Sequence, residues 1–117
     1  MASHPTPELT EIAPAEAHQL VTRGAMLLDV REPDEWAAGH APEATHVPME
    51  QVTAQRAALP PDRRIVAVCR SGGRSGKVTE ALTSWGFDAV NLAGGMQAWA
   101  AAGFEVVADD GAPGTVV

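Results

Sequence analysis

The chain has 117 residues but only one cysteine, Cys69. A single thiol excludes a disulfide within the chain, which fits a reducing compartment. It also means that no second thiol of this chain can react with whatever forms on Cys69. No apolar run approaches the roughly 18 residues of a membrane-spanning helix, and residues 1–8 lack the basic and apolar regions of a signal peptide. We therefore expect a cytoplasmic protein that has no membrane partner.

Basic residues are also scarce, with 8 Lys and Arg against 15 Asp and Glu and a net charge of −7. Because nucleic acids and anionic membranes favour basic faces, we expect no nucleic-acid partner. Five of the eight cationic residues nevertheless fall between positions 63 and 77, namely Arg63, Arg64, Arg70, Arg74 and Lys77. A solvated surface cluster and an anion site explain Arg63 and Arg64 equally well. Arg70 and Arg74 lie in a flexible loop and predict a small-anion site.

The length leaves room for one domain. We expect a disordered tail over residues 1–8, one folded domain over 9–107 and a loose tail over 108–117. The pattern of apolar runs, prolines and glycines predicts strands at 9–12, 25–30, 44–48, 65–68, 88–92 and 105–107. It predicts helices at 14–22, 33–38, 50–59, 75–85 and 96–102.

This alternation of strands and helices indicates an α/β fold. Its short connections favour an open parallel sheet with helices on both faces. Ligands of such sheets bind outside the carboxyl ends of the strands. Cys69 follows the predicted strand 65–68 directly, so the sequence places it at such an end.

The residues that follow this strand predict a reactive thiolate; they are Cys69, Arg70, Ser71, Gly72, Gly73, Arg74 and Ser75. A free cysteine has a pKa of about 8.5, and a helix N-terminus with nearby guanidinium groups can lower it to about 7 or below. The glycines let the loop amides point inward, and the serine hydroxyls can donate hydrogen bonds. A lone cysteine is more often an inert core residue, but a core position would not be followed by so polar and flexible a loop. The histidines have no metal-ligand spacing with Cys69, so we expect no metal and no cofactor.

Three motifs give the chain a family resemblance. The loop from Cys69 to Ser75 resembles the active-site loop of single-domain rhodaneses, the thiosulfate-type sulfurtransferases. The segment Leu28-Asp29-Val30-Arg31-Glu32, with Glu35-Trp36 and Gly39-His40-Ala41-Pro42, resembles the upstream signature of that family. The segment Leu92-Ala93-Gly94-Gly95-Met96-Gln97-Ala98-Trp99, with Gly103, resembles its C-terminal signature. The three motifs cover about residues 27–106 and imply a rhodanese-like fold.

The resemblance also implies a mechanism. Cys69 would attack the outer sulfur of thiosulfate or a related small anionic donor and carry the sulfur as a persulfide. Residues 70–75 would bind the donor and the persulfide, and Arg70 and Arg74 would favour an anion. Asp29 and Arg31 would support the loop, whereas Glu35 would lie at the pocket mouth and temper its charge. Cyanide, or a thiol or protein from outside the chain, would accept the sulfur.

Two other functions stay open at this point. Phosphatases with a cysteine nucleophile, one type of which shares the rhodanese fold, place five residues between cysteine and arginine. Here four residues separate Cys69 from Arg74. The shorter loop suits a sulfur atom better than a phosphate group. A phosphatase or arsenate reductase is therefore the less favoured alternative. The second alternative is a non-catalytic binding or sensor module that uses the same fold.

Overall fold

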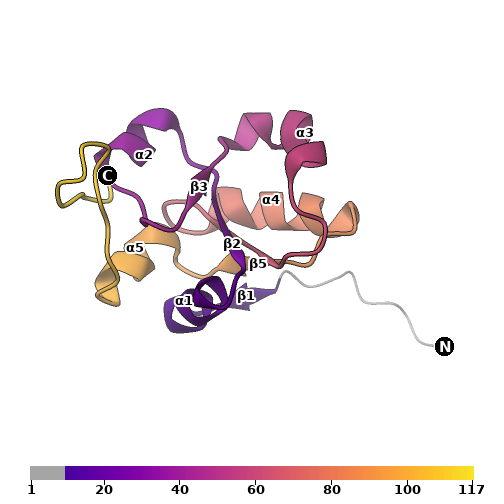
Figure 1. Ribbon diagram of the computed structural model, residues 1–117, viewed down its shortest axis with the longest axis horizontal. Helices are drawn as coiled ribbons and strands as arrows, with labels where there is room; N and C mark the ends of the chain where they lie inside the picture. The colour runs from indigo at the N-terminus through magenta and orange to yellow at the C-terminus, as the bar shows by residue number, and fades with distance from the viewer. Residues whose placement is uncertain (1–9) are drawn as a thin grey trace.

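The computed structural model describes residues 10–117 and contains one parallel sheet (Figure 1). Its five strands lie in the order β1-β5-β4-β2-β3, and every pairing between neighbours is parallel. The strands are β1 (Glu11–Ile12), β2 (Met26–Asp29), β3 (Thr45–His46), β4 (Ile65–Val68) and β5 (Ala89–Leu92). The predicted open parallel sheet is confirmed. The predicted tail over residues 1–8 lies outside the described residues.

Helices cover both faces of the sheet (Figure 1). They are α1 (Pro14–Thr22), α2 (Pro33–Ala38), α3 (Val52–Gln55), α4 (Gly73–Ser84) and α5 (Gly95–Ala101), with single 3-10 turns η1 (Met49–Gln51) and η2 (Arg56–Ala58) on either side of α3. One apolar core joins α1 and α5 to the sheet, and the other joins α3 and α4 to its opposite face. Adjacent strand residues such as Leu27 and Leu28 enter different cores, because successive side chains of a strand point to opposite faces. Within residues 10–117 no helix is long and apolar enough to cross a membrane.

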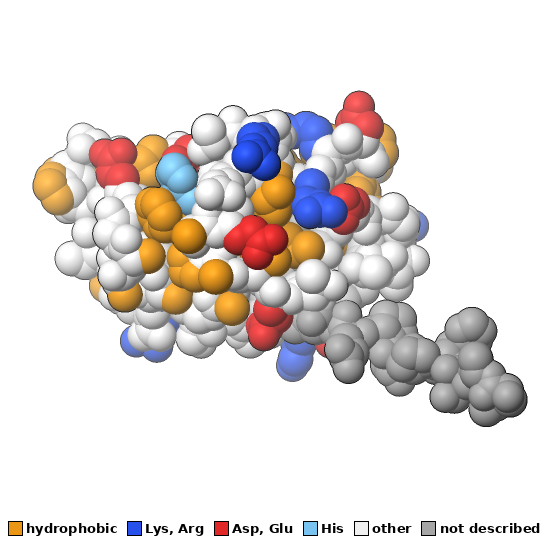
Figure 2. Space-filling view, turned by 90° about the horizontal axis from the view of Figure 1, so that it is seen from below, with side chains coloured by type: hydrophobic (Ala, Val, Ile, Leu, Met, Phe, Trp, Pro, Cys, Tyr) orange, Lys and Arg blue, Asp and Glu red, His pale blue; other side chains and the backbone are white. Residues whose placement is uncertain are grey.

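The core on the side of α1 and α5 contains the buried Trp99 and is covered by partly exposed side chains. Trp99 is fully buried there, and its indole nitrogen donates a hydrogen bond to the carbonyl oxygen of Glu105 at 3.1 Å. Phe104 packs against Trp99 and stacks on the His18 ring, with ring centroids 4.3 Å apart. Seen from below, this side shows grouped hydrophobic side chains bordered by acidic and basic ones (Figure 2). Partly buried hydrophobic side chains, among them Leu20, Val21 and Phe104, pack against this core.

Two predicted helices differ from the structure in their extent. The expected helix over 50–59 is instead η1, α3 and η2 in succession. Only Val52 and Leu59 are buried in that segment, so it has no continuous apolar face to hold a regular helix against the sheet. The helix expected from Ser75 begins two residues earlier, at Gly73, because Gly72 takes a left-handed conformation (φ 115°) and forms the N-cap.

Residues 108–117, which we expected to be a loose tail, fold back beside α2 (Figure 1). Val107 forms an antiparallel bridge with His40. Beyond it, the Thr115 amide donates to the Ala38 carbonyl at 3.0 Å, and the Asp109 amide donates to the Ala37 carbonyl at 3.1 Å. Main-chain hydrogen bonds of this kind need no apolar periodicity, so the sequence pattern contained no signal for them.

Gly39 makes this approach possible. A Cβ atom at Gly39 would overlap the main chain of Thr115. The same residue accepts a hydrogen bond from the buried Arg31 guanidinium through its carbonyl oxygen, at 2.7 Å. The end of α2 is therefore held from inside by Arg31 and from outside by the C-terminal segment.

We predict that Gly39→Ala releases the C-terminal segment, since the added methyl group cannot fit against the Thr115 backbone. Overpacking of this kind costs about 1–3 kcal/mol. Urea denaturation should show the loss, and amide hydrogen exchange should show faster exchange at Thr115. Gly73→Ala is the matched control, because a Cβ there meets no atom within 4 Å. Unchanged exchange at Thr115 in Gly39→Ala would contradict the prediction.

Candidate active site

Cys69 lies at the carboxyl end of β4, between the neighbouring strands β5 and β2. All four residues of β4 are buried, and Cys69 itself is 1% exposed. The first turn of α5 holds the loop backbone, because the Met96 amide donates to the Cys69 carbonyl at 2.8 Å and the Gln97 amide donates to the Arg70 carbonyl at 3.0 Å. The motifs around Cys69 and Gly94-Gly95 thus meet in space.

Hydrogen-bond donors of the loop surround the sulfur of Cys69. The Gly72 amide donates to Sγ at 3.1 Å, and the Ser75 hydroxyl oxygen lies 3.2 Å from Sγ. Burial raises the pKa of the Cys69 thiol, but the Ser75 hydroxyl and the amides of Ser75, Gly72 and Ser71 outweigh burial and lower that pKa. Donors that favour the charged form stabilise a thiolate in this way. The arrangement can therefore supply a sulfur nucleophile.

The guanidinium groups of the loop have partners of their own. Arg74 donates from Nη1 and Nη2 to the two carboxylate oxygens of Glu35, at 2.7 and 2.8 Å. These hydrogen bonds lower the pKa of Glu35 to about 2, and they raise the pKa of Arg74. Arg70 is exposed and donates from Nε to the main-chain oxygen of Val117 at 2.9 Å. The loop hydrogen bonds are the largest of the causes that lower the pKa of Cys69. The charge of the Cys69 thiolate in turn helps to raise the pKa of Arg74.

Asp29 and Arg31 form a fully buried ion pair at the end of β2. Arg31 donates to Asp29 from Nε at 3.0 Å and from Nη2 at 2.8 Å. Asp29 pairs in register with Val68 of β4, and Arg31 also binds the Gly39 carbonyl. The pair thus connects the strand that precedes Cys69 to the end of the helix that carries Glu35.

Asn91 is a polar residue of the site that our sequence reasoning did not assign. It is fully buried in β5, and its Oδ1 lies 2.6 Å from the Ser75 hydroxyl oxygen. Its Nδ2 donates to the Gly72 carbonyl at 3.1 Å and to Glu11 Oε2 at 3.0 Å. An amide inside an otherwise apolar strand, beside the strand that ends at Cys69, is the signal that could have identified it.

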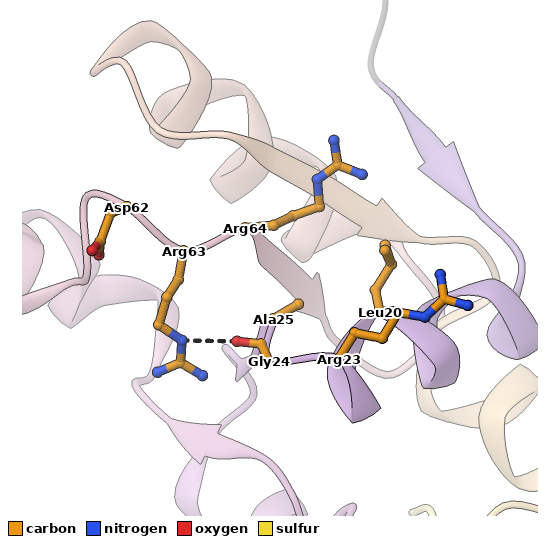
Figure 3. A pocket seen from close by; sticks show the side chains of 7 residues that line it. All are labelled: Leu20, Arg23, Gly24, Ala25, Asp62, Arg63 and Arg64. Carbon is orange, nitrogen blue, oxygen red and sulfur yellow. Dashed lines mark hydrogen bonds between the residues drawn. The ribbon is translucent and has the colours of Figure 1, made fainter.

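A shallow cavity of about 340 Å³ lies at the opposite end of the sheet (Figure 3). Its lining residues are Leu20, Arg23, Gly24, Ala25, Asp62, Arg63 and Arg64. Arg63 donates to the Gly24 carbonyl at 2.9 Å, and Arg64 forms an exposed ion pair with Asp88. The three guanidinium groups point in different directions in Figure 3. They therefore do not converge on one anion, which favours solvated surface charge for Arg63 and Arg64.

Metal ligation has no support in the described part of the chain. Among residues 10–117, no group of three His, Cys, Asp or Glu side chains is placed to hold a metal ion. The site consists instead of one thiol, its amide and hydroxyl donors, and the surrounding ion pairs.

Fold and site together define an α/β protein with a buried free cysteine, surrounded by hydrogen-bond donors, at the carboxyl end of a central parallel strand. Residues 13–102 match the sequence profile of the Rhodanese-like domain, and the chain belongs to this family. It is 40% identical over 91 residues to a sulfurtransferase of Allochromatium vinosum, with 77% of this chain and 85% of that protein covered. It is 35% identical over 89 residues to the thiosulfate sulfurtransferase GlpE of Pseudomonas paraeruginosa, with 75% and 81% covered.

Solved structures agree with this assignment. A rhodanese-related protein from Thermoplasma volcanium superposes with a TM-score of 0.78 at 28% identity, covering 84% of this chain and 97% of that one. The rhodanese-like fold that the sequence motifs implied is confirmed.

We predict that Ser75→Ala raises the pH midpoint of Cys69 alkylation by about one unit, because the thiolate loses a hydroxyl donor. The rate of reaction with iodoacetamide, measured against pH, reports this midpoint directly, since the chain has one cysteine. Ser71→Ala is the control: the Ser71 amide, which the substitution keeps, is the group that acts on the sulfur. A midpoint that Ser75→Ala leaves unchanged would refute the role of the hydroxyl.

The lowered pKa of Glu35 predicts a pH-dependent contribution to stability. The folded-state pKa is about 2 and the ordinary value is 4.5, so the pair with Arg74 stabilises the fold fully above pH 4.5 and progressively less as the pH falls toward 2. Glu35→Gln should therefore lower the free energy of unfolding at pH 7, and its difference from the wild type should shrink below pH 4.5. Urea denaturation at several pH values measures both.

Asp88→Asn is the control for Glu35→Gln. The ion pair of Asp88 with Arg64 is 62% and 44% exposed, and such surface pairs contribute little. An equal loss of stability in both variants, or a Glu35→Gln difference that persists at pH 2, would contradict the prediction.

Proposed function

We propose that the chain is a sulfurtransferase that moves a sulfane sulfur from thiosulfate, or a related small anionic donor, to an external acceptor. The observation that carries the proposal is the buried Cys69 sulfur with amide and hydroxyl donors directed at it. The names of its relatives, a sulfurtransferase and a thiosulfate sulfurtransferase, support the same class of reaction. The intermediate in our proposal is a persulfide on Cys69.

The first step is a displacement at sulfur. The Cys69 thiolate attacks the outer sulfur of thiosulfate, a new S–S bond forms to Sγ, and the S–S bond of thiosulfate breaks. Sulfite leaves with the bonding electrons as a dianion, and the outer sulfur keeps the negative charge that it carried in thiosulfate, so the persulfide is an anion. The amides of residues 70–75 are the donors that would stabilise both anions, since preorganised N–H groups act on developing charge without rearranging.

Binding of an anionic donor would depend chiefly on the loop amides and Arg70. Within residues 10–117 Arg70 forms no ion pair with an Asp or Glu side chain, whereas the charge of Arg74 is matched by Glu35. The ion pair with Arg74 supports the role that the family resemblance implies for Glu35, which is to temper the positive charge beside the loop. This pairing weakens the preference for a dianion that two free arginines would produce, so thiosulfate and other sulfane donors both fit the proposal.

The second step needs a nucleophile from outside the chain. Cyanide would attack the outer sulfur of the persulfide, form thiocyanate and return Cys69 as the thiolate. In the cell a thiol, free or on a protein, would take the place of cyanide, because the chain has no second cysteine. Such two-step covalent catalysis needs a thiol that stays reduced, and we propose the cytoplasm as its location.

The contacts of Arg74 disfavour phosphatase chemistry. A cysteine phosphatase uses the loop arginine to grip phosphoryl oxygens, but here both Nη atoms of Arg74 bind the Glu35 carboxylate. The side chain would have to give up two charge-assisted hydrogen bonds before it could bind phosphate.

We predict that the wild type forms thiocyanate from thiosulfate and cyanide and that Cys69→Ser does not, because a serine hydroxyl carries no sulfur. Mass spectrometry after incubation with thiosulfate alone should show the gain of one sulfur atom on the wild type. Circular dichroism confirms that the variant is folded.

Two results would count against the proposal. A wild type that forms no more thiocyanate than Cys69→Ser and gains no sulfur would reject the enzyme and favour a binding or sensor module. Cys69-dependent turnover of an aryl phosphate would favour the phosphatase instead.

A further inference from the structure

The Ser75 hydroxyl has more acceptors within reach than it has protons. Its oxygen lies 2.6 Å from Asn91 Oδ1, 3.2 Å from Cys69 Sγ and 3.4 Å from the Gly72 carbonyl. A serine hydroxyl carries one proton and donates one hydrogen bond. Asn91 and Cys69 are therefore in competition for that proton.

The orientation of the Asn91 amide decides what this residue can do in the competition. Both partners on its other side, the Glu11 carboxylate and the Gly72 carbonyl, can only accept. The NH₂ group must face these two acceptors, so Oδ1 must face Ser75 and can only accept from it. At 2.6 Å the contact requires a proton between the two oxygens, and Ser75 is the group that supplies it.

The position of this proton fits one charge state of Cys69 better than the other. When Cys69 is a neutral thiol, its S–H can donate to Ser75 Oγ while Ser75 donates to Asn91, so all three groups are satisfied. When Cys69 is a thiolate, the Ser75 proton is needed at sulfur, and Oδ1 of the fully buried Asn91 loses its donor. A buried acceptor without a donor costs free energy. Asn91 therefore opposes the thiolate, whereas Ser75 favours it.

We propose that Asn91 is a positioning residue that holds the Ser75 hydroxyl proton away from sulfur while Cys69 is a thiol and releases it when the thiolate forms. Glu11 strengthens this hold, because a carboxylate that accepts from Nδ2 polarises the amide and makes Oδ1 a better acceptor. The use of this arrangement in catalysis rests on the proposed function. The attacking Cys69 thiolate needs the Ser75 hydrogen bond at Sγ. The persulfide needs that bond less, because its negative charge lies on the outer sulfur.

Other charged groups around Cys69 do not depend on Asn91. They are Arg70 in the loop, Arg74 on α4, Glu35 on α2, Asp29 and Arg31 beside β4, and Glu11 on β1. Of these only Glu11 contacts Asn91 directly. A change at Asn91 that acts through the hydroxyl must therefore depend on Ser75.

The test is a double-mutant cycle on the pH profile of Cys69 alkylation by iodoacetamide. Asn91→Leu is close to isosteric and removes the competing acceptor, while the Gly72 carbonyl keeps its bond from the Gly76 amide at 3.0 Å. The midpoint should fall by about half to one pH unit, which is about three to ten times more thiolate at a pH below both midpoints. In a Ser75→Ala background the same substitution should leave the midpoint unchanged.

Thr79→Val is the matched control. It removes another buried hydroxyl of α4, which donates to the Ser75 carbonyl at 2.8 Å rather than to sulfur. Its midpoint should equal that of the wild type. The proposal would be overturned if Asn91→Leu raised the midpoint or left it unchanged. It would also be overturned if the midpoint fell equally with and without the Ser75 hydroxyl, because that would show a structural or general electrostatic effect.

A measurement on the wild type removes the risk that Asn91→Leu does not fold. The side-chain carbonyl carbon of Asn91, followed by NMR, should shift with the same midpoint as Cys69 because Oδ1 loses its donor there. In Ser75→Ala this shift should be absent. A carbon resonance that does not respond to the titration of Cys69 in the wild type would overturn the proposal.

Alkylation needs no sulfur transfer, so the two proposals can fail separately. A cycle that behaves as described, in a protein that forms no thiocyanate, would reject the sulfurtransferase and retain the role of Asn91. Thiocyanate formation with no shift in Asn91→Leu would reject only the role of Asn91.

Discussion

The site depends on one electrostatic problem, the stabilisation of negative charge on a sulfur atom that is almost completely buried. Burial alone would keep Cys69 a thiol, because low-dielectric surroundings disfavour the charged form. The loop solves the problem with short-range donors, the amides of Ser71, Gly72 and Ser75 and the Ser75 hydroxyl. The parallel sheet and the first turn of α5 hold the loop backbone and so fix the positions of those donors.

Several charged side chains lie near Cys69, but they form ion pairs with one another that hold elements of the fold together. The buried pair of Asp29 and Arg31 fixes the frame, and the pair of Glu35 and Arg74 joins α2 to α4 across the mouth of the loop. In each pair the positive and the negative side chain balance each other's charge. Negative charge on the sulfur is stabilised chiefly by hydrogen bonds from the loop, which act over a few ångströms.

The sequence predicted the features that local chemistry determines. Strand 65–68 was placed at its observed ends because its β-branched run stops at a polar loop, and the parallel sheet followed from short connections. Family resemblance suggested Glu35 at the mouth of the pocket, but it did not identify Arg74 as its partner, since 39 positions separate the two residues. Asn91 was seen only as part of a strand, because its role depends on two other elements that meet it in space. The fold of residues 108–117 was missed for a related reason: main-chain hydrogen bonds are not encoded in side-chain pattern.

The contact between Gly39 and the C-terminal segment has an evolutionary consequence. Only Val116 of this segment packs against an apolar core, yet the segment holds the end of the helix that carries Glu35. A lineage can therefore lengthen, replace or lose this segment while it keeps the sheet and the cysteine loop intact. Such changes would move the carboxylate relative to Arg74 and alter the charge that an incoming donor meets. In the sulfurtransferase that we propose, donor preference could thus diverge through a peripheral segment while Cys69 and its loop stay the same.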